Sequence, residues 1–204
     1  TELTKLLPQA EQILTRVGQA AGELFAEGAE SLTTDRWAPF FEFLATEEKL
    51  VIHGWRPVPT DDSTLSPISA RNMPHFEQFF VSTVALDTGL ALDRAVYPLR
   101  QRARTEAGVY FASLSGRTTV YKGMLTTQQL PQVFPELLDE RVESALSLVH
   151  SRFSTNTFPA WELAHPYRLM AHNGEINTVK GNRNWMHARE NQLSSDLIGG
   201  DLQR

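Results

Sequence analysis

Residues 150–190 read HSRFSTNTFPAWELAHPYRLMAHNGEINTVKGNRNWMHARE, and this stretch decides how the whole chain is interpreted. It contains two polar clusters, His150-Ser151-Arg152 and His172-Asn173-Gly174-Glu175. Each cluster follows a short apolar run, ALSLV at 145–149 and YRLMA at 167–171. We therefore expect both runs to be strands. The clusters would then lie at strand ends, where proteins commonly display binding groups.

The two clusters carry groups that suit an amino acid substrate. Arg152 can donate two parallel hydrogen bonds to a carboxylate. The Asn173 amide and the Gly174 backbone N–H can point at one oxyanion, and glycine lets a ligand approach closely. Each feature also has an ordinary structural explanation, a surface salt bridge for Arg152 and a turn for the Asn-Gly pair. The density of polar groups in both clusters favours a site for an amino acid whose carbonyl undergoes acyl transfer.

Composition limits the classes of function. The chain has 204 residues with 41% hydrophobic residues, enough for one domain with a core. A net charge of −5 argues against nucleic acid as a partner. No apolar stretch is long enough to predict a membrane span, and the first residues do not resemble a secretory signal. Cysteine is absent, which fits a cytoplasmic protein and excludes a disulfide or a cysteine ligand within these residues.

The apolar periodicity predicts an α+β fold. We expect five helices. The first covers 9–27, and the second runs from Asp35 as its N-cap to about Glu48. The third is about fifteen residues long and contains Leu92 and Ala103, the fourth is short and lies near 126–134, and the fifth covers 176–192. We expect strands over 50–55, 76–84, 109–115, 118–124, 145–152 and 167–171. Gly116-Arg117 would be the two-residue turn of a hairpin, with Gly116 at positive φ. Trp185 is expected in the core, and residues 1–49 form a helical segment of uncertain assignment.

Other chemistries are less favoured by the sequence. The six histidines lack the spacing of metal ligands, so no metal site is expected. Neither GxGxxG nor GxxxxGK[ST] occurs. Thr1 could act as a nucleophile with its own amine as base. The residues that follow it are helix-like and polar, whereas such a nucleophile should begin a buried strand.

The strings HSRFSTNTFP and HNGEINT closely resemble the class II glutamine amidotransferase domain of the glutamate synthases, which belongs to the N-terminal-nucleophile hydrolase superfamily. The resemblance continues upstream through HGWRPVP (53–59), FEQFFVSTV (76–84), VYFASLSGRTTVYKGML (109–125) and FPELLDERVESALSLVHSRFSTN (134–156). It implies that residues 1–204 are part of one such domain. The implied fold is a four-layer α/β/β/α sandwich with two stacked antiparallel sheets.

The resemblance also implies roles for individual residues. Arg152 would hold the α-carboxylate of glutamine, with Thr155 and Asn156 shaping the pocket floor beside it. Asn173 and Gly174 would form the oxyanion hole. The full-length enzyme would hydrolyse glutamine to glutamate and ammonia, and the ammonia would serve the reductive amination of 2-oxoglutarate.

The sequence departs from the family pattern in one respect. The family's nucleophile is a chain-initial cysteine, and these residues contain none. We therefore expect a central part of the domain that is inactive alone. Its partners would be glutamine, the synthase segments of the same protein, and ferredoxin or a nicotinamide-dependent small subunit. FMN and an iron–sulfur cluster would belong to the synthase portion, with no cofactor in this chain. The alternative is a degenerate, non-catalytic amidotransferase that binds an amino acid or scaffolds a partner.

Overall fold

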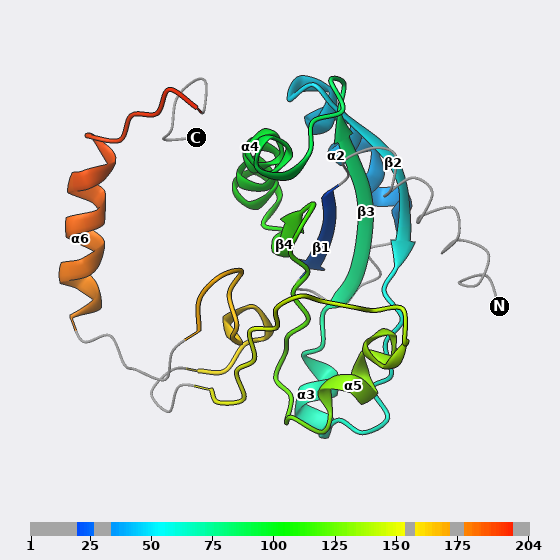
Figure 1. The fold of residues 1–204 in the computed structure, drawn as a ribbon. Helices are drawn as coiled ribbons and strands as arrows, with labels where there is room; N and C mark the ends of the chain where they lie inside the picture. Colours follow the sequence, from blue (N-terminus) through cyan, green and yellow to red (C-terminus); the bar gives the residue numbers. More distant parts are fainter. Residues whose placement is uncertain (1–19, 27–33, 154–157, 172–177, 198–204) are drawn as a thin grey trace.

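The computed structural model describes residues 20–26, 34–153, 158–171 and 178–197. In this part of the chain, four strands form one antiparallel sheet in the order β2-β3-β1-β4 (Figure 1). The strands are β1 (Ala20–Ala26), β2 (Leu50–Pro57), β3 (His75–Thr83) and β4 (Tyr110–Ser115). The helices are α2 (Thr34–Glu47), α3 (Pro67–Arg71), α4 (Gly89–Ala107), α5 (Leu130–Val133) and α6 (Val179–Glu190), with short 3-10 helices η1 (Pro135–Leu138) and η2 (Trp161–Leu163).

Helices α2 and α4 share one apolar core with the sheet. Phe79 and Val81 alternate along β3 and are fully buried against the two helices. The side chains that α2 and α4 contribute recur at helical spacing and are also fully buried: Phe41, Leu44, Leu92, Val96, Leu99 and Ala103. This periodicity is the reason that the sequence places both helices on the sheet.

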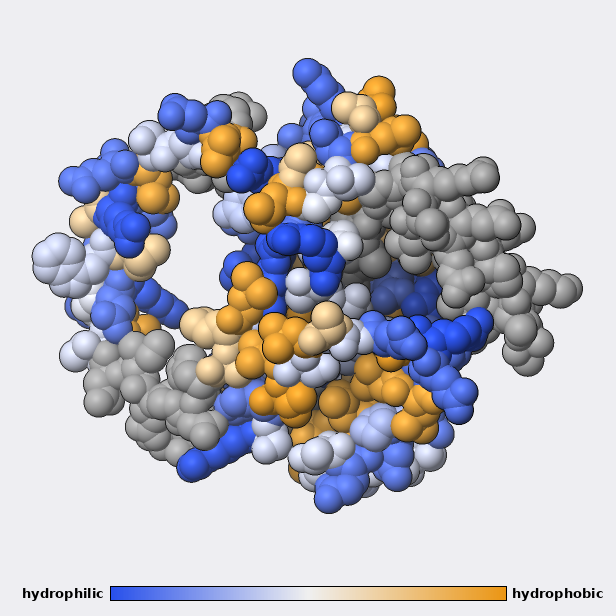
Figure 2. All heavy atoms as spheres, viewed as in Figure 1, coloured by the Kyte–Doolittle hydropathy of each residue, from blue (hydrophilic) through white to orange (hydrophobic). Residues whose placement is uncertain are grey.

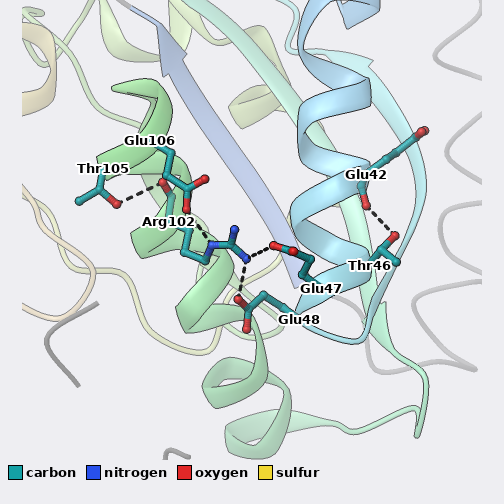
Figure 3. Close-up of polar contacts among 7 residues, drawn as sticks. All are labelled: Glu42, Thr46, Glu47, Glu48, Arg102, Thr105 and Glu106. Carbon is teal, nitrogen blue, oxygen red and sulfur yellow. Dashed lines mark hydrogen bonds and ion pairs between the residues drawn. The ribbon is translucent and has the colours of Figure 1, made fainter. Parts of the chain in front are cut away.

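Arg102 joins the two helices at the surface (Figure 3). Its guanidinium contacts Glu47 at 2.7 Å and Glu48 at 3.0 Å, which lie at and just after the end of α2. The same side chain pairs with Glu106 one turn further along α4 at 2.8 Å. The bond to Glu106 is the first reason that the Arg102 pKa is raised, and the bonds to the other two carboxylates act in the same direction. The pair of helices is thereby held in register over the sheet.

A second apolar cluster lies toward the lower end of the sheet in the view of Figure 1, and it connects the sheet to the loops that follow β4. Phe76, Phe134 and Trp161 make edge-to-face ring contacts there, with centroids 5.2 and 5.8 Å from Phe76. In Figure 2 apolar residues gather over this lower part, around α3 and α5, on an otherwise largely hydrophilic face. The cluster fixes the loops that carry the candidate site.

Most of the expected regular elements are confirmed. Helices α2, α4, α5 and α6 and strands β2, β3 and β4 lie close to the predicted ranges. The sequence misplaces one boundary: Asp35 lies inside the first turn of α2 and is not its N-cap. Residues 9–19 of the first predicted helix, and Ile176 and Asn177 of the last, lie outside the described residues.

The first predicted helix is wrong where it can be compared, because Ala20–Ala26 form strand β1. Local propensity for a helix is weak compared with tertiary pairing. β1 is flanked by two partners, with Phe25 opposite Phe76 in β3 and Gly22 opposite Leu114 in β4. Both edges of its backbone are therefore hydrogen-bonded within the sheet, and pairing with two neighbouring strands outweighs the local helical pattern.

The predicted hairpin after β4 is also wrong. Gly116 does not have a positive φ, and residues 118–124 form no strand. Asp93 of α4 organises the bend instead, because its Oδ1 accepts hydrogen bonds from Ser115 Oγ at 2.8 Å and from the Gly116 N–H at 3.2 Å. The N–H of Val120 then donates to Ser113 Oγ and not to a backbone carbonyl. Hydrogen bonds to side chains therefore take the place of the backbone hydrogen bonds that a hairpin would need.

Three further expectations are not met in the described part of the chain. Residues 145–152 and 167–171 form no strand, and Tyr167 and Met170 instead close a tight turn through two 2.8 Å backbone bonds. Leu146 is 85% and Val149 72% exposed, so the apolar run before the first cluster does not belong to a core of the described residues. Trp185 is 79% exposed and α6 buries no residue, so Trp185 does not belong to the core of the described residues.

Candidate functional site

A cavity of about 460 Å³ lies beside Arg152. Its walls come from the start of α3, the loop after β4 and the segment that carries the first polar cluster. Its lining residues include Gly123, Met124, His150, Arg152, Ala164 and His165. Segments that are distant in sequence thus meet around the arginine that the sequence singled out.

Arg152 keeps its guanidinium available at this cavity. Its side chain is exposed and makes no ion pair with any carboxylate of the described residues. Of the acidic residues shortly upstream, Asp139, Glu140 and Glu143, Asp139 is bound by Arg141 at 2.6 Å. The ordinary explanation of Arg152 as a surface salt-bridge partner therefore finds no support in this part of the chain.

His150 and His165 form the wall next to Arg152. The backbone N–H of Arg152 donates to Nδ1 of His150 at 3.2 Å. The His150 and His165 rings lie 4.8 Å apart, and the His165 ring meets Tyr167 edge-on at 4.6 Å. Nδ1 of His150 is the acceptor in the bond from Arg152. The position of the Arg152 backbone is thereby linked to a stack of three rings.

Lys122 is a buried cation behind this wall. It is 2% exposed, and its ammonium donates to Tyr110 Oη at 2.7 Å and to the backbone oxygens of Glu162 at 2.7 Å and Ala164 at 2.8 Å. The ammonium also lies over the Tyr167 ring at 4.4 Å. Burial lowers the pKa of this amine to about 8, against the opposing effect of Glu162.

Asp93 is a buried carboxylate that holds the segment after the ring stack. Its Oδ2 accepts from Arg168 at 2.9 Å and from Arg117 at 3.2 Å. Burial acts to raise the Asp93 pKa, but the hydrogen bonds from Ser115, Arg117 and Gly116 and the Arg168 charge outweigh it and hold the pKa below its usual value. Asp93 is therefore ionised at neutral pH.

The remaining predicted site residues, Thr155, Asn156, Asn173 and Gly174, lie outside the described residues. Of the predicted set, Arg152 alone can be located, and its role is not tested by its position. The sequence patterns do not single out Lys122, Asp93 or His165. A signal existed for Lys122, a single cation in the otherwise uncharged run TTVYKGM, whereas the pairing of Asp93 with Arg168 depends on tertiary contacts that no spacing reveals.

The family model for class-II glutamine amidotransferases matches residues 3–204. The chain belongs to this family. As a class-II glutamine amidotransferase, it is 46% identical over 167 residues to "Glutamate synthase [NADPH] large chain" of Bacillus subtilis (strain 168), which covers 79% of this chain and 11% of the relative. The resemblance drawn from the HSRFSTNTFP and HNGEINT strings is confirmed.

Two further relatives of this amidotransferase differ in the electron donor that their names print. "Ferredoxin-dependent glutamate synthase, chloroplastic" of Oryza sativa subsp. japonica is 43% identical over 162 residues, covering 76% of this chain and 10% of the relative. "Glutamate synthase [NADH]" of Schizosaccharomyces pombe (strain 972 / ATCC 24843) is 40% identical over 193 residues, covering 90% of this chain and 9% of the relative. The chain thus spans about a tenth of the length of these relatives.

The described residues of this amidotransferase show neither a metal-binding cluster nor a membrane-spanning helix. They contain no group of three or more His, Cys, Asp or Glu side chains that could hold a metal ion. None of their helices is both long and apolar enough to cross a membrane. The 204 residues also contain no cysteine, so they do not fit a cysteine-ligated iron–sulfur cluster.

Proposed function

We propose that this chain is the glutamine-binding part of a glutamate synthase, in which glutamine is hydrolysed and the released ammonia serves the reductive amination of 2-oxoglutarate. The observation that carries the proposal is the family match over residues 3–204, with relatives of 37% to 46% identity that are all named glutamate synthases. The exposed Arg152 beside a cavity of about 460 Å³ supports the same function.

The proposed chemistry assigns each residue one task. The Arg152 fork binds the α-carboxylate of glutamine, with Thr155 and Asn156 at the pocket floor. Asn173 and Gly174 donate to the oxyanion that develops when the amide carbon is attacked. These donors lower the barrier to glutamine hydrolysis only if their hydrogen bonds to the substrate are stronger in the transition state than in the ground state. The domain would adopt the two-sheet α/β/β/α sandwich, of which the described residues supply one sheet with two helices on one face.

A non-catalytic module is the second candidate, and one observation favours it. The 204 residues contain no cysteine, so a thiol nucleophile must come from elsewhere in the protein. The coding sequence upstream of Thr1 discriminates the two. A cysteine codon directly after the initiator Met or a propeptide supports the hydrolase, and its absence supports a degenerate module that binds an amino acid or scaffolds a partner.

The proposed cofactors and partners follow from the same assignment. FMN and an iron–sulfur cluster would be bound by synthase segments outside these residues. The electron donor would be ferredoxin or a nicotinamide-dependent small subunit, since the relatives' names include both kinds. A cytoplasmic location stays a prediction, because three of the relatives are named chloroplastic.

The direct test is enzymatic and uses the full-length protein. Glutamate formation from 2-oxoglutarate is measured with glutamine and, separately, with ammonia as the nitrogen source. We expect both reactions, and we expect Arg152→Ala to abolish the first and spare the second. Failure of the wild-type protein to use glutamine would reject the proposed function.

A further inference from the structure

The ammonium of Lys122 connects two separate walls of the cavity beside Arg152. Lys122 directly precedes Gly123 and Met124, which line the cavity on one side. Two of its hydrogen bonds reach the backbone oxygens of Glu162 and Ala164 on the other side. Ala164 and the next residue, His165, line the cavity there. One buried side chain therefore sets the distance between the walls.

The same connection reaches the proposed substrate-binding arginine. His165 stacks on His150 at 4.8 Å, and Nδ1 of His150 accepts the backbone N–H of Arg152 at 3.2 Å. A shift of the Ala164–His165 segment would therefore move His150 and, through it, the backbone of Arg152. We propose that Lys122 is a positioning residue for glutamine, which holds the Ala164–His165 wall in place and thereby sets the pocket that Arg152 serves. This inference rests on the proposed function.

The geometry suits the charged form of Lys122. An ammonium has three N–H donors, and Lys122 has three partners at 2.7–2.8 Å, one hydroxyl and two carbonyls. A neutral amine can still donate to both carbonyls and accept from the Tyr110 hydroxyl, but its bonds to the carbonyls lose the charge that makes them about twice as strong. The carbonyls of Glu162 and Ala164 are then held less firmly, and the segment that carries them is expected to shift more easily. The pocket wall should thus loosen when Lys122 loses its proton.

Deprotonation occurs within an accessible pH range. The amine has a pKa of about 8, and the groups that face it are Tyr110 of β4, Tyr167 and Glu162 of the opposite segment, and Arg100 of α4. Burial raises the pKa of Tyr110 to about 12 and that of Tyr167 above its usual value, so both stay neutral near pH 8. Arg100 stays charged although burial lowers its pKa. Lys122 is therefore the group of this cluster whose charge changes near pH 8.

The expected effect on substrate affinity has a definite sign. If only the protonated form presents the competent wall, the competent fraction is about 0.9 at pH 7 and about 0.1 at pH 9, and the apparent KM for glutamine rises by about tenfold. The substrate's own α-amine also titrates at alkaline pH. The informative quantity is therefore the ratio of the KM of Lys122→Met to that of wild type. We expect this ratio to fall from about tenfold at pH 7 to below about twofold at pH 9.

The experiment uses the full-length protein with three variants. Lys122→Met removes the amine, and Lys49→Met is the matched control at an exposed lysine in the turn between α2 and β2. Tyr110→Phe keeps the ring and removes one acceptor that stabilises the ammonium, so Lys122 should lose its proton more easily and the KM of this variant should begin to rise at a lower pH than that of wild type. Ammonia-dependent glutamate synthesis should be unchanged in all three, because that reaction bypasses the pocket.

Hydrogen exchange gives a readout that does not depend on activity. After correction for the intrinsic pH dependence of exchange, backbone amides of 161–168 should lose protection between pH 7 and pH 9 in wild type, and should be poorly protected at both values in Lys122→Met. Equal protection of wild type at both pH values would overturn the proposal, whether or not Lys122→Met folds. Parallel loss of ammonia-dependent synthesis in Lys122→Met would also overturn it, since Lys122 would then hold the whole fold. A third outcome is possible, in which wild type hydrolyses no glutamine but still loses hydrogen-exchange protection between pH 7 and pH 9. It would reject the proposed function and the role of Lys122 in glutamine binding. It would retain the structural role of Lys122 in holding the Ala164–His165 wall.

Discussion

The buried carboxylate of Asp93 accepts a hydrogen bond from the guanidinium of Arg168 at 2.9 Å, although the two residues lie 75 positions apart in the sequence. Asp93 is on α4, and Arg168 precedes the HNG string by only a few residues. The pair therefore fixes the start of the segment that leads to the proposed oxyanion residues. Together with the Lys122 bonds, it attaches residues 162–168 at two points, to α4 and to the loop after β4.

Asp93→Asn should destabilise the protein because it removes the charge that two arginines share. We expect a loss of about 1.5–3 kcal/mol in the free energy of unfolding, the usual contribution of hydrogen bonds to a charged group. Thermal unfolding of the domain checks this, with a lower midpoint expected. Asp62→Asn is the control, because Asp62 is exposed and its substitution should stay within about 0.5 kcal/mol. Equal effects of the two variants would contradict the role of the Asp93–Arg168 pair.

The Asp93 contribution should also disappear in acid. The Asp93 pKa is lowered from 3.8 in the folded protein, so the carboxyl group adds stability that is present above this ordinary value. That stability is lost as the pH falls through the lower folded-state pKa. The difference in unfolding free energy between wild type and Asp93→Asn should therefore be larger at pH 7 than at pH 3. A difference that stayed constant over this range would show that the carboxylate charge is not its source.

Gly123→Ala should disturb the cavity wall through overpacking. A Cβ at Gly123 would overlap ring carbons Cζ3 and Cε3 of Trp161, which is 3% exposed and cannot move into solvent. Overpacking of this kind costs about 1–3 kcal/mol of stability. Gly54→Ala provides the comparison, because nothing lies within 4 Å of its added Cβ. Denaturant unfolding of both variants should separate them, and a stable Gly123→Ala protein would mean that Trp161 is free to shift.

The sequence predicted those elements whose signal is local and periodic. Helix α4 was found because Leu92, Val96, Leu99 and Ala103 recur on one face, and all are buried. β1 was mistaken for a helix because its state depends on two partner strands that are distant in the sequence. For the site, Arg152 was visible from its chemistry, whereas Lys122 and Asp93 were not. Their importance comes from carbonyls and guanidinium groups that only the folded chain brings to them.

Arg152→Lys should weaken glutamine binding in the full-length protein. An ammonium cannot reproduce the two parallel bonds of a guanidinium to a carboxylate, so we expect the KM to rise by about tenfold to a hundredfold, equivalent to about 1.4–2.7 kcal/mol. Arg94→Lys, at an exposed position of α4, should leave the KM unchanged. An unchanged KM in Arg152→Lys together with a lower unfolding temperature would assign Arg152 a structural role instead.

Asn173→Ala should affect the transition state and leave substrate binding intact. Asn173 lies outside the described residues, so this prediction follows from the family resemblance and from the chemistry of the HNG string. Removal of one oxyanion donor lowers kcat by about 10²–10³-fold with little change in KM. Steady-state kinetics with glutamine should show this, while Asn184→Ala, at an exposed position of α6, should behave as wild type. Ammonia-dependent synthesis provides the decisive comparison, because it needs no oxyanion hole. If Asn173→Ala lowers both activities together, the residue supports the fold and not the proposed hydrolysis.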